Sequence, residues 1–232
     1  MSRLPVKERR LQGRSAVRTG RPPKERAGEV DERILDAARR VFLERGLAGA
    51  SMEEIAGLAC AGKPTIYARF ASKEALFTAV VMRNVAATIG HFEGYAPTGT
   101  SMEERLTSVG ATILHWALVG GTVDLMRVSI AESRRFPDLA SSVHIMACQR
   151  AEEPVARLLG EAAQSEELAS LPAFAPQRLA ATAQFFIDVV FMPMILRALF
   201  GEKPDALRAE IGPLVARSVA FFLAACRHGG VN

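Results

Sequence analysis

The chain is poor in the residues that build disulfide frameworks and metal sites. Its 232 residues include three cysteines, at positions 60, 148 and 226, and four histidines. An odd number of widely separated thiols excludes a fully paired disulfide framework, and their spacing fits no metal site. We therefore expect reduced, buried thiols in a cytoplasmic protein that holds neither a metal nor a cofactor.

Common catalytic signatures are also absent. The chain has no Gly-x-Ser-x-Gly and no His-Glu-x-x-His motif, and no histidine follows a glutamate by three residues as in di-iron helical bundles. Residues 57–63 match the start of a phosphate-binding loop, Gly-x-x-x-x-Gly-Lys. However, Pro64 occupies the Ser/Thr position that binds magnesium, and a helical pattern precedes the motif. We expect no enzyme activity, with a nucleotide-binding enzyme as an alternative.

Long uninterrupted apolar runs and strand-like alternation are missing too. The longest apolar run, residues 185–196, contains Asp188 and Pro193 and is too short to span a bilayer. The N-terminus lacks the apolar core of a signal peptide. Helical spacing of apolar residues recurs from residue 30 to residue 226. The sequence predicts an all-α protein without a membrane partner.

Positive charge is concentrated at the N-terminus. Residues 1–27 hold nine basic and two acidic residues, a net charge of +7, whereas the whole chain carries +4. The remaining chain is therefore mildly acidic, at −3. Because apolar residues are few, we expect residues 1–28 to form a disordered basic arm. Arg21 and Lys24 are its candidate DNA contacts, in the manner of homeodomain arms, and a solubilising tail is the alternative.

Residues 51–70 predict two short helices joined by a turn. Ser51, with a glutamate three residues later, forms a capping-box pattern that begins the first helix. Gly62 interrupts that helix, and Pro64 suits the first turn of the next. Residues 30–45 supply a third helix with one apolar face. This order predicts a helix-turn-helix, whose recognition helix enters the major groove of DNA.

Several sequence landmarks stand in register through this region. They are Phe-x-x-x-Gly from Phe42 to Gly46, Ile55-Ala56, Thr-x-Tyr-x-x-Phe from Thr65 to Phe70, and Ser72-Lys73-Glu74. With them, residues 34–81 resemble the TetR family of transcriptional repressors. The resemblance implies a helix-turn-helix DNA-binding domain at residues 29–89. It also implies a larger helical-bundle domain at residues 90–232 that binds a ligand and dimerises.

Candidate DNA contacts follow from side-chain chemistry within this motif. Cationic, hydroxyl and helix N-terminal groups suit phosphates, and small or methyl-bearing side chains permit close approach to bases. The candidate phosphate contacts are Ser51, Lys63, Tyr67, Arg69 and Lys73, and the candidate base contacts are Gly62, Lys63, Pro64, Thr65 and Ala68. Arg69 could equally pair with an acidic neighbour. Residues 60–62 and Arg69 depart from the family pattern, which bears on operator sequence.

The larger domain offers aromatic and sulfur-containing side chains for an apolar or aromatic effector. The candidate pocket residues are His115, Trp116, Met126, His144, Phe185, Phe186 and Asp188. An ordinary packed core is the alternative, and apolar residues at helical spacing more often form one. Residues 127–137 resemble the efflux-type repressors of the family, which implies broad, apolar effectors.

The last two predicted helices, at residues 177–200 and 204–226, are apolar on more than one face. In TetR-type proteins such helices pair with those of a second subunit, and the resemblance implies a homodimer here. The candidate interface residues are Phe191, Leu207, Ile211, Leu214, Val215, Val219 and Phe222. A dimer would hold two recognition helices one helical turn of DNA apart, about 34 Å, over a palindromic operator. A purely intramolecular core, or a ligand-binding protein with little DNA binding, is the alternative.

Overall fold

The structure is a computed structural model that describes residues 24–91, 97–119, 121–162, 168 and 170–228. Within these ranges the chain is helical and contains no strand. The all-α prediction is confirmed. The helices are α1 (Lys24–Gly49), α2 (Met52–Leu58), α3 (Lys63–Tyr67), α4 (Lys73–Gly90), α5 (Met102–Val119), α6 (Thr122–Glu132), α7 (Pro137–Ala162), α9 (Leu179–Leu199) and α10 (Pro204–Arg227), with short 3₁₀ turns at Pro172–Phe174 and Pro176–Arg178.

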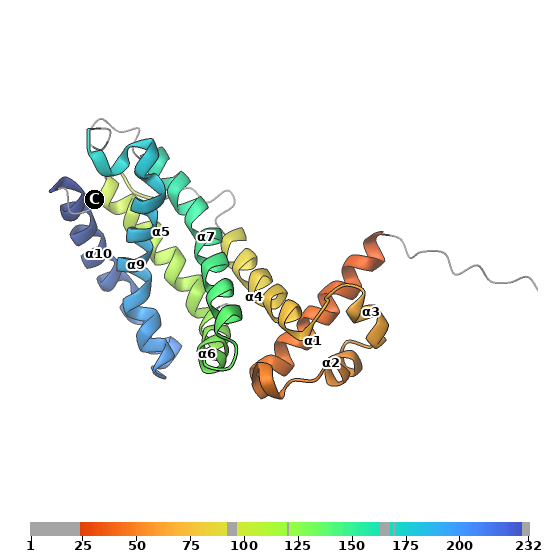
Figure 1. The fold of residues 1–232 in the computed structure, drawn as a ribbon. Coiled ribbons are helices and arrows are strands. Elements are labelled where there is room, and N and C mark those ends of the chain that lie inside the picture. The colour runs from red at the N-terminus through yellow and green to blue at the C-terminus, as the bar shows by residue number, and fades with distance from the viewer. Residues whose placement is uncertain (1–23, 92–96, 120, 163–167, 169, 229–232) are drawn as a thin grey trace, which may run out of the picture.

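Helices α1 to α3 form a small unit at one end of the molecule, and α4 leads from it into the larger bundle (Figure 1). Their apolar residues make one buried cluster with α4. Phe42 and Phe77 meet edge-to-face at its centre, with ring centroids 5.3 Å apart. Leu125 of α6 and Val143 of α7 belong to the same cluster. The small unit is therefore packed directly against the larger one.

Helix ends agree with the sequence signals. The Ser51 hydroxyl accepts the Glu54 N–H at 3.1 Å, and the Ser72 hydroxyl accepts the Ala75 N–H at 3.1 Å, so both serines act as N-caps. The Glu54 carboxylate does not complete the capping box, because it pairs with Arg45 at 2.9 Å. Helical geometry is interrupted at Gly46, whose φ of 69° lies in the left-handed region that favours glycine.

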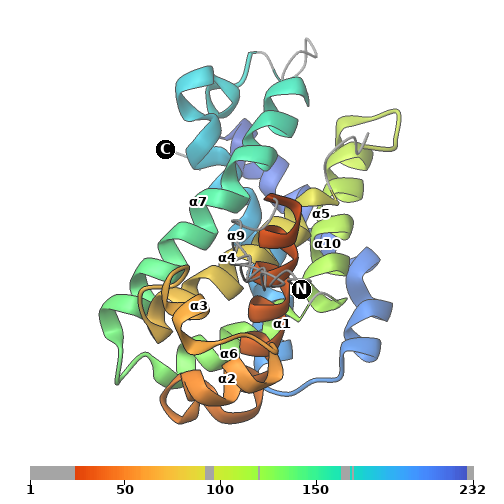
Figure 2. The same cartoon turned by 90° about the vertical axis from the view of Figure 1, so that its right-hand side faces the viewer.

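Helices α5, α7, α9 and α10 enclose the larger core, and α9 and α10 lie on the side away from α1–α3 (Figures 1 and 2). Gly110 of α5 allows α10 to come close. A Cβ at this position would lie 2.7 Å from Val215 Cγ1, which is closer than packed carbons approach. The ends of α9 and α10 are joined by Arg197, which pairs with both Glu202 and Glu210 at 2.7 Å.

Three sequence-based expectations need correction. Helix α1 begins at Lys24, so the last five residues of the expected 1–28 arm are helical. The thiols are not uniformly buried, since Cys60 is exposed and Cys148 half-buried, while Cys226 is buried. Finally, the apolar run at residues 185–196 lies inside α9, and the 3₁₀ turn at Pro176–Arg178 extends the helical stretch to 24 residues. By length and composition alone that helix and α10 could each cross a membrane.

Candidate DNA interface and apolar pocket

The turn between α2 and α3 is set by a left-handed residue, Cys60, with φ of 49°. The Ala61 N–H donates to the Ala56 carbonyl at 3.1 Å, and the Cys60 N–H donates to the Gly57 carbonyl at 3.2 Å. This bond pair is the Schellman pattern that ends many helices, usually around a glycine. Gly62 is the N-cap of α3, with extended backbone. The position that needs left-handed geometry is thus Cys60, whereas the sequence had placed the helix break at Gly62.

Most of the candidate base contacts lie on the open surface of α3. Gly62, Lys63, Pro64 and Ala68 are exposed, and Thr65 is half-buried. Tyr67 is also exposed, at 51%. Ile66, by contrast, is fully buried and anchors α3 to the small core. The short and polar side chains of the helix are therefore largely exposed, while Ile66 packs it against the small core.

The arginine and lysine side chains near α3 pair with acidic neighbours. Lys63 Nζ donates to the Glu53 carboxylate, and this hydrogen bond is the main reason the pKa of Glu53 lies below its usual range. Arg69 Nε donates to Asp31 of α1, and its Nη1 reaches the Thr65 carbonyl at 3.4 Å. The acidic partner considered for Arg69 is thus present. Lys63 and Glu53 are both exposed, so phosphate can compete for this lysine.

Lys73 has a structural role that the sequence did not indicate. Its ammonium donates to the Ala48 carbonyl at 3.2 Å and to the Ala50 carbonyl at 2.9 Å, at the C-terminal end of α1. Two of its three donors are therefore committed to backbone, and Ser51 is likewise engaged as an N-cap. Arg21 lies outside the described residues. Lys24 is the first residue of α1, and its side chain is not described.

The segment that matched a phosphate-binding loop has the wrong geometry for that function. Residues 57–63 run from the last turn of α2, through the Cys60 turn, to the start of α3. A phosphate-binding loop instead follows a strand and opens a longer helix. The nucleotide-binding alternative is therefore not supported by this structure.

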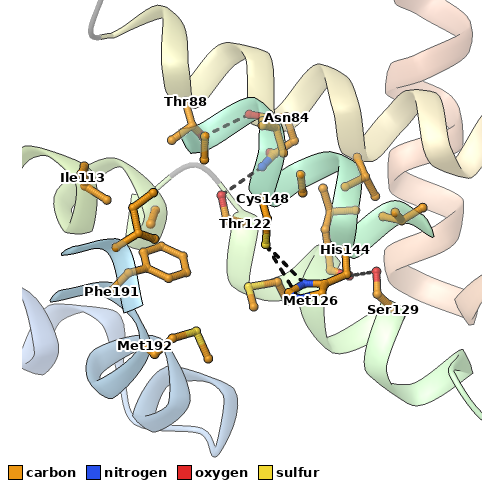
Figure 3. A pocket seen from close by; sticks show the side chains of 18 of the residues that line it. Asn84, Thr88, Ile113, Thr122, Met126, Ser129, His144, Cys148, Phe191 and Met192 are labelled. Atoms are coloured by element: carbon orange, nitrogen blue, oxygen red, sulfur yellow. Dashed lines mark hydrogen bonds between the residues drawn. The ribbon is translucent and has the colours of Figure 1, made fainter. Parts of the chain in front are cut away.

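A second feature is a cavity of about 760 Å³ in the larger bundle. Side chains from α4, α5, α6, α7 and α9 line it, and most of them are apolar (Figure 3). Its volume lies within the range of about 300–1,000 Å³ that is typical of ligand sites. The helices that wall it include α4 and α6, which also pack against the small N-terminal unit.

The polar groups of the pocket mostly bond to one another or to nearby backbone. Asn84 Nδ2 donates to the Thr122 hydroxyl at 3.0 Å, and Gln184 Nε2 donates to Asp188 at 2.9 Å. Cys148 Sγ lies 3.7 Å from His144 Nδ1, one helical turn away (Figure 3). Burial and then the nearby charges of Asp188 and Glu152 raise the pKa of the Cys148 thiol. The thiol is therefore a neutral part of the wall.

Only part of the expected pocket set lies at this cavity. Met126, His144 and Asp188 line it, as does Gln184. The other four candidates do not. His115 is exposed, Trp116 stacks on His91 with ring centroids 3.4 Å apart, and Phe185 and Phe186 pack against Phe222 in the core at 5.9 and 5.2 Å. The polar pair Asn84 and Thr88, one turn apart in the C-terminal half of α4, was the available sequence signal for this part of the pocket wall.

The residues of α10 that were expected at a dimer interface are instead buried within one chain. Six of them, Leu207, Ile211, Leu214, Val215, Val219 and Phe222, are between 0% and 8% exposed. Side chains buried in this way have no surface left for a partner, so they form the intramolecular core against α5 and α9. The seventh, Phe191, is half-buried and lines the pocket. The exposed apolar groups of these helices are different residues, among them Phe200 at 85% and Phe221 at 62%.

A direct contact links the pocket wall to the small unit. Glu132, at the end of α6, follows the pocket residues Ser129 and Ile130. Its Oε1 accepts the Ala48 N–H at 2.9 Å, across 84 positions in sequence. A Cβ at Gly46 would lie only 2.8 Å from the same oxygen, so a larger residue there would displace this carboxylate, and the left-handed φ separately favours glycine. Helix α6 thus contacts the segment that leads from α1 into α2.

A helix-turn-helix packed on a helical bundle with an internal pocket defines a ligand-binding class of transcriptional regulators. Two family models match the chain. Residues 34–80 match "Bacterial regulatory proteins, tetR family", and residues 104–227 match "AefR-like transcriptional repressor, C-terminal domain". The second match alone covers more than half of the chain. The chain therefore belongs to the TetR family of bacterial transcriptional regulators.

Related regulators match this chain over segments shorter than the combined span of the two family models. The transcriptional activator FasR of Mycolicibacterium smegmatis is 38% identical over 85 residues, which is 37% of each chain. The transcriptional regulator UidR of Escherichia coli is 38% identical over 60 residues, 26% of this chain and 31% of UidR. The matched part of the chain thus spans only about a third of these relatives.

Solved structures match over most of the fold. A Mesorhizobium loti protein assigned to the TetR family aligns with a TM-score of 0.69 and 25% identity, covering 86% of this chain and 98% of that one. The regulator FadR of Bacillus subtilis, solved with stearoyl-CoA, aligns with a TM-score of 0.57 and 19% identity, covering 81% and 98%. This second likeness concerns the fold alone.

Proposed function

We propose that the protein is a dimeric repressor that binds a palindromic operator through α3 and releases it when an apolar effector occupies the pocket. The single observation that carries the proposal is the exposed, short-side-chain face of α3, held by the buried Ile66 beside a bundle with a 760 Å³ cavity. Repression, rather than activation, is favoured by the repressor C-terminal domain that matches residues 104–227.

DNA reading is assigned to the α3 surface. Gly62, Pro64 and Ala68 allow close approach to base edges, and the Thr65 methyl can contact thymine. Lys63 and Tyr67 are exposed and reach phosphates, with Lys63 leaving Glu53 to do so. Arg69 and Lys73 serve mainly to fix the unit internally, since both are engaged with α1.

Dimerisation is assigned to the outer faces of α9 and α10. These helices are strongly apolar, yet only 33% and 39% of their most apolar windows are buried within one chain. Exposed Phe221 is accompanied on α10 by the exposed small residues Ala216 and Ala220, which allow close helix approach. A second copy covering this face would remove a large apolar surface from water.

The pocket and the DNA-reading unit are coupled in this proposal through α4 and α6. Both helices line the cavity and both pack against the small core. An effector that binds better to a different arrangement of these helices shifts the population away from the operator-bound form, by no more than its differential affinity.

The DNA assignment is tested by gel-shift titration with the DNA upstream of the protein's own gene at several salt concentrations. We expect specific binding that weakens with salt, and Lys63→Ala should reduce the salt slope by about 1. Tyr67→Phe should weaken binding without changing the oligomeric state. Absence of salt-sensitive binding would overturn the regulator proposal, and increased transcription from that promoter in vitro would overturn repression.

The dimer assignment is tested by light scattering after size-exclusion chromatography. Ala220→Glu places a charge on the proposed α10 face and should give monomers that still unfold cooperatively. Ala131→Glu, at an exposed position on α6, is the matched control and should remain dimeric. A monomeric unsubstituted protein, or an unchanged Ala220→Glu dimer, would contradict this interface.

A further inference from the structure

The described residues of the pocket lining carry negative formal charge and no positive formal charge. Of the described residues that line the cavity, none is lysine or arginine, and Asp188 is the one among them with a formal charge at neutral pH. Arg127, which is adjacent in sequence to the lining residue Met126, is engaged elsewhere. It pairs with Asp124 at 2.9 Å and donates to the Ala198 and Leu199 carbonyls at the end of α9.

Asp188 retains capacity to accept a further partner. Its one hydrogen bond within the described chain comes from Gln184, and it forms no ion pair with a described residue. Glu152 adds a second carboxylate at this side, one turn beyond Cys148 on α7, and it is also without an ion pair among the described residues. Both carboxylates act on the Cys148 thiol and help to raise its pKa.

An aromatic ring completes the environment. Phe191 lines the pocket three residues after Asp188 on α9, so the two side chains lie on neighbouring positions of one helix face. A carboxylate beside an aromatic ring is a favourable environment for an organic cation, because the ring face and the acid both attract positive charge. Asp188 is exposed, so an anionic head group placed beside it would meet a like charge whose repulsion water partly screens, with no lysine or arginine in the described lining to offset it.

We infer that the effector is an apolar molecule that carries a positive charge, held with its cationic group beside Asp188 and Phe191 and its apolar body in the cavity. The inference deepens the proposed function, because it rests on the pocket being the effector site. It separates this pocket from one built for a fatty acid or another anionic lipid, whose head group is favoured by a lysine, an arginine or a helix N-terminus.

The test compares ions that differ in the sign of their charge. Tetraphenylphosphonium and tetraphenylborate form an aromatic pair of nearly equal size, and decyltrimethylammonium and decyl sulfate form an alkyl pair. Binding of each to the full-length protein is measured by isothermal titration calorimetry. We expect at least one cation to bind about tenfold more tightly than its anionic match. An anion that binds as tightly as its match in both pairs, or failure of both cations to bind, overturns the inference.

Single substitutions identify which carboxylate causes the preference for cations. Asp188→Asn keeps the side-chain shape and an acceptor for Gln184, and it should remove most of the tenfold preference. Glu152→Gln should reduce the preference less, because Glu152 is outside the lining. Glu153→Gln, an exposed neighbour, should leave it unchanged. A preference that persists in Asp188→Asn overturns the assignment to this residue.

Operator binding, measured separately by gel shift, distinguishes failure of this inference from failure of the proposed regulatory function. A protein that binds operator DNA but shows no cation preference refutes this inference alone.

Discussion

Removing the Glu132 carboxylate tests whether α6 is fastened to the helix-turn-helix by one hydrogen bond. In Glu132→Ala the half-buried Ala48 N–H loses its acceptor, and the change also removes the oxygen that fills the space over Gly46. An unsatisfied buried donor costs about 1–3 kcal/mol. Since this N–H is partly accessible to water, we expect a loss near the lower end, about 1 to 2 kcal/mol.

The measurement is urea unfolding followed by circular dichroism at 222 nm, with protein concentration held fixed. The midpoint should fall while the slope stays constant, because the area exposed on unfolding is unchanged. Glu132→Gln is the matched control. Its amide oxygen can still accept from Ala48, so it should retain more than half of the lost stability. If both variants are equally destabilised, the charge matters and not the hydrogen bond, and an unchanged Glu132→Ala would refute the reasoning altogether.

Three further changes have defined outcomes. Cys60→Gly should raise the free energy of unfolding by about 0.5 to 1 kcal/mol, because glycine adopts φ of 49° without strain, and a lower melting temperature would contradict this. Lys73→Met leaves two backbone carbonyls without their donor and should cost about 1 to 2 kcal/mol in urea unfolding, whereas exposed Lys203→Met should not. Burial raises the pKa of the Cys226 thiol from 9.0 to about 11, so the unfolded chain loses this proton first as pH rises. Stability should therefore fall between pH 9 and 11, by about 2 to 3 kcal/mol, and Cys226→Ala should remove that part of the pH dependence.

The local signals in the sequence were sufficient for the helices and for the DNA-reading unit. Ser51 caps the helix that it was expected to cap. Ser72 caps α4 and Gly46 interrupts α1 through residues that are equally close in the chain. These features depend on neighbouring residues in the chain, so spacing and side-chain chemistry identify them directly. The exposed face of α3 also depends on local helical spacing, with Ile66 as its buried residue.

Residues that meet across the fold were less accessible to sequence reasoning. Trp116 and Phe186 had the right chemistry for a pocket, but one stacks on His91 and the other packs in the core. Whether an apolar side chain faces a cavity or a neighbour depends on which helices approach it, and periodicity gives only the face of its own helix.

The sequence by itself determined that this is an all-α chain with a helix-turn-helix, because capping, turn and periodicity signals are local. The motifs at residues 34–81 added the resemblance to the TetR family. Tertiary structure alone decided that the apolar stripe of α10 is buried within one chain, since Gly110 lets α5 come close to Val215. It likewise decided that Lys73 and Glu132 bind the end of α1. Such contacts join residues far apart in the chain, so they exist only once the helices have packed.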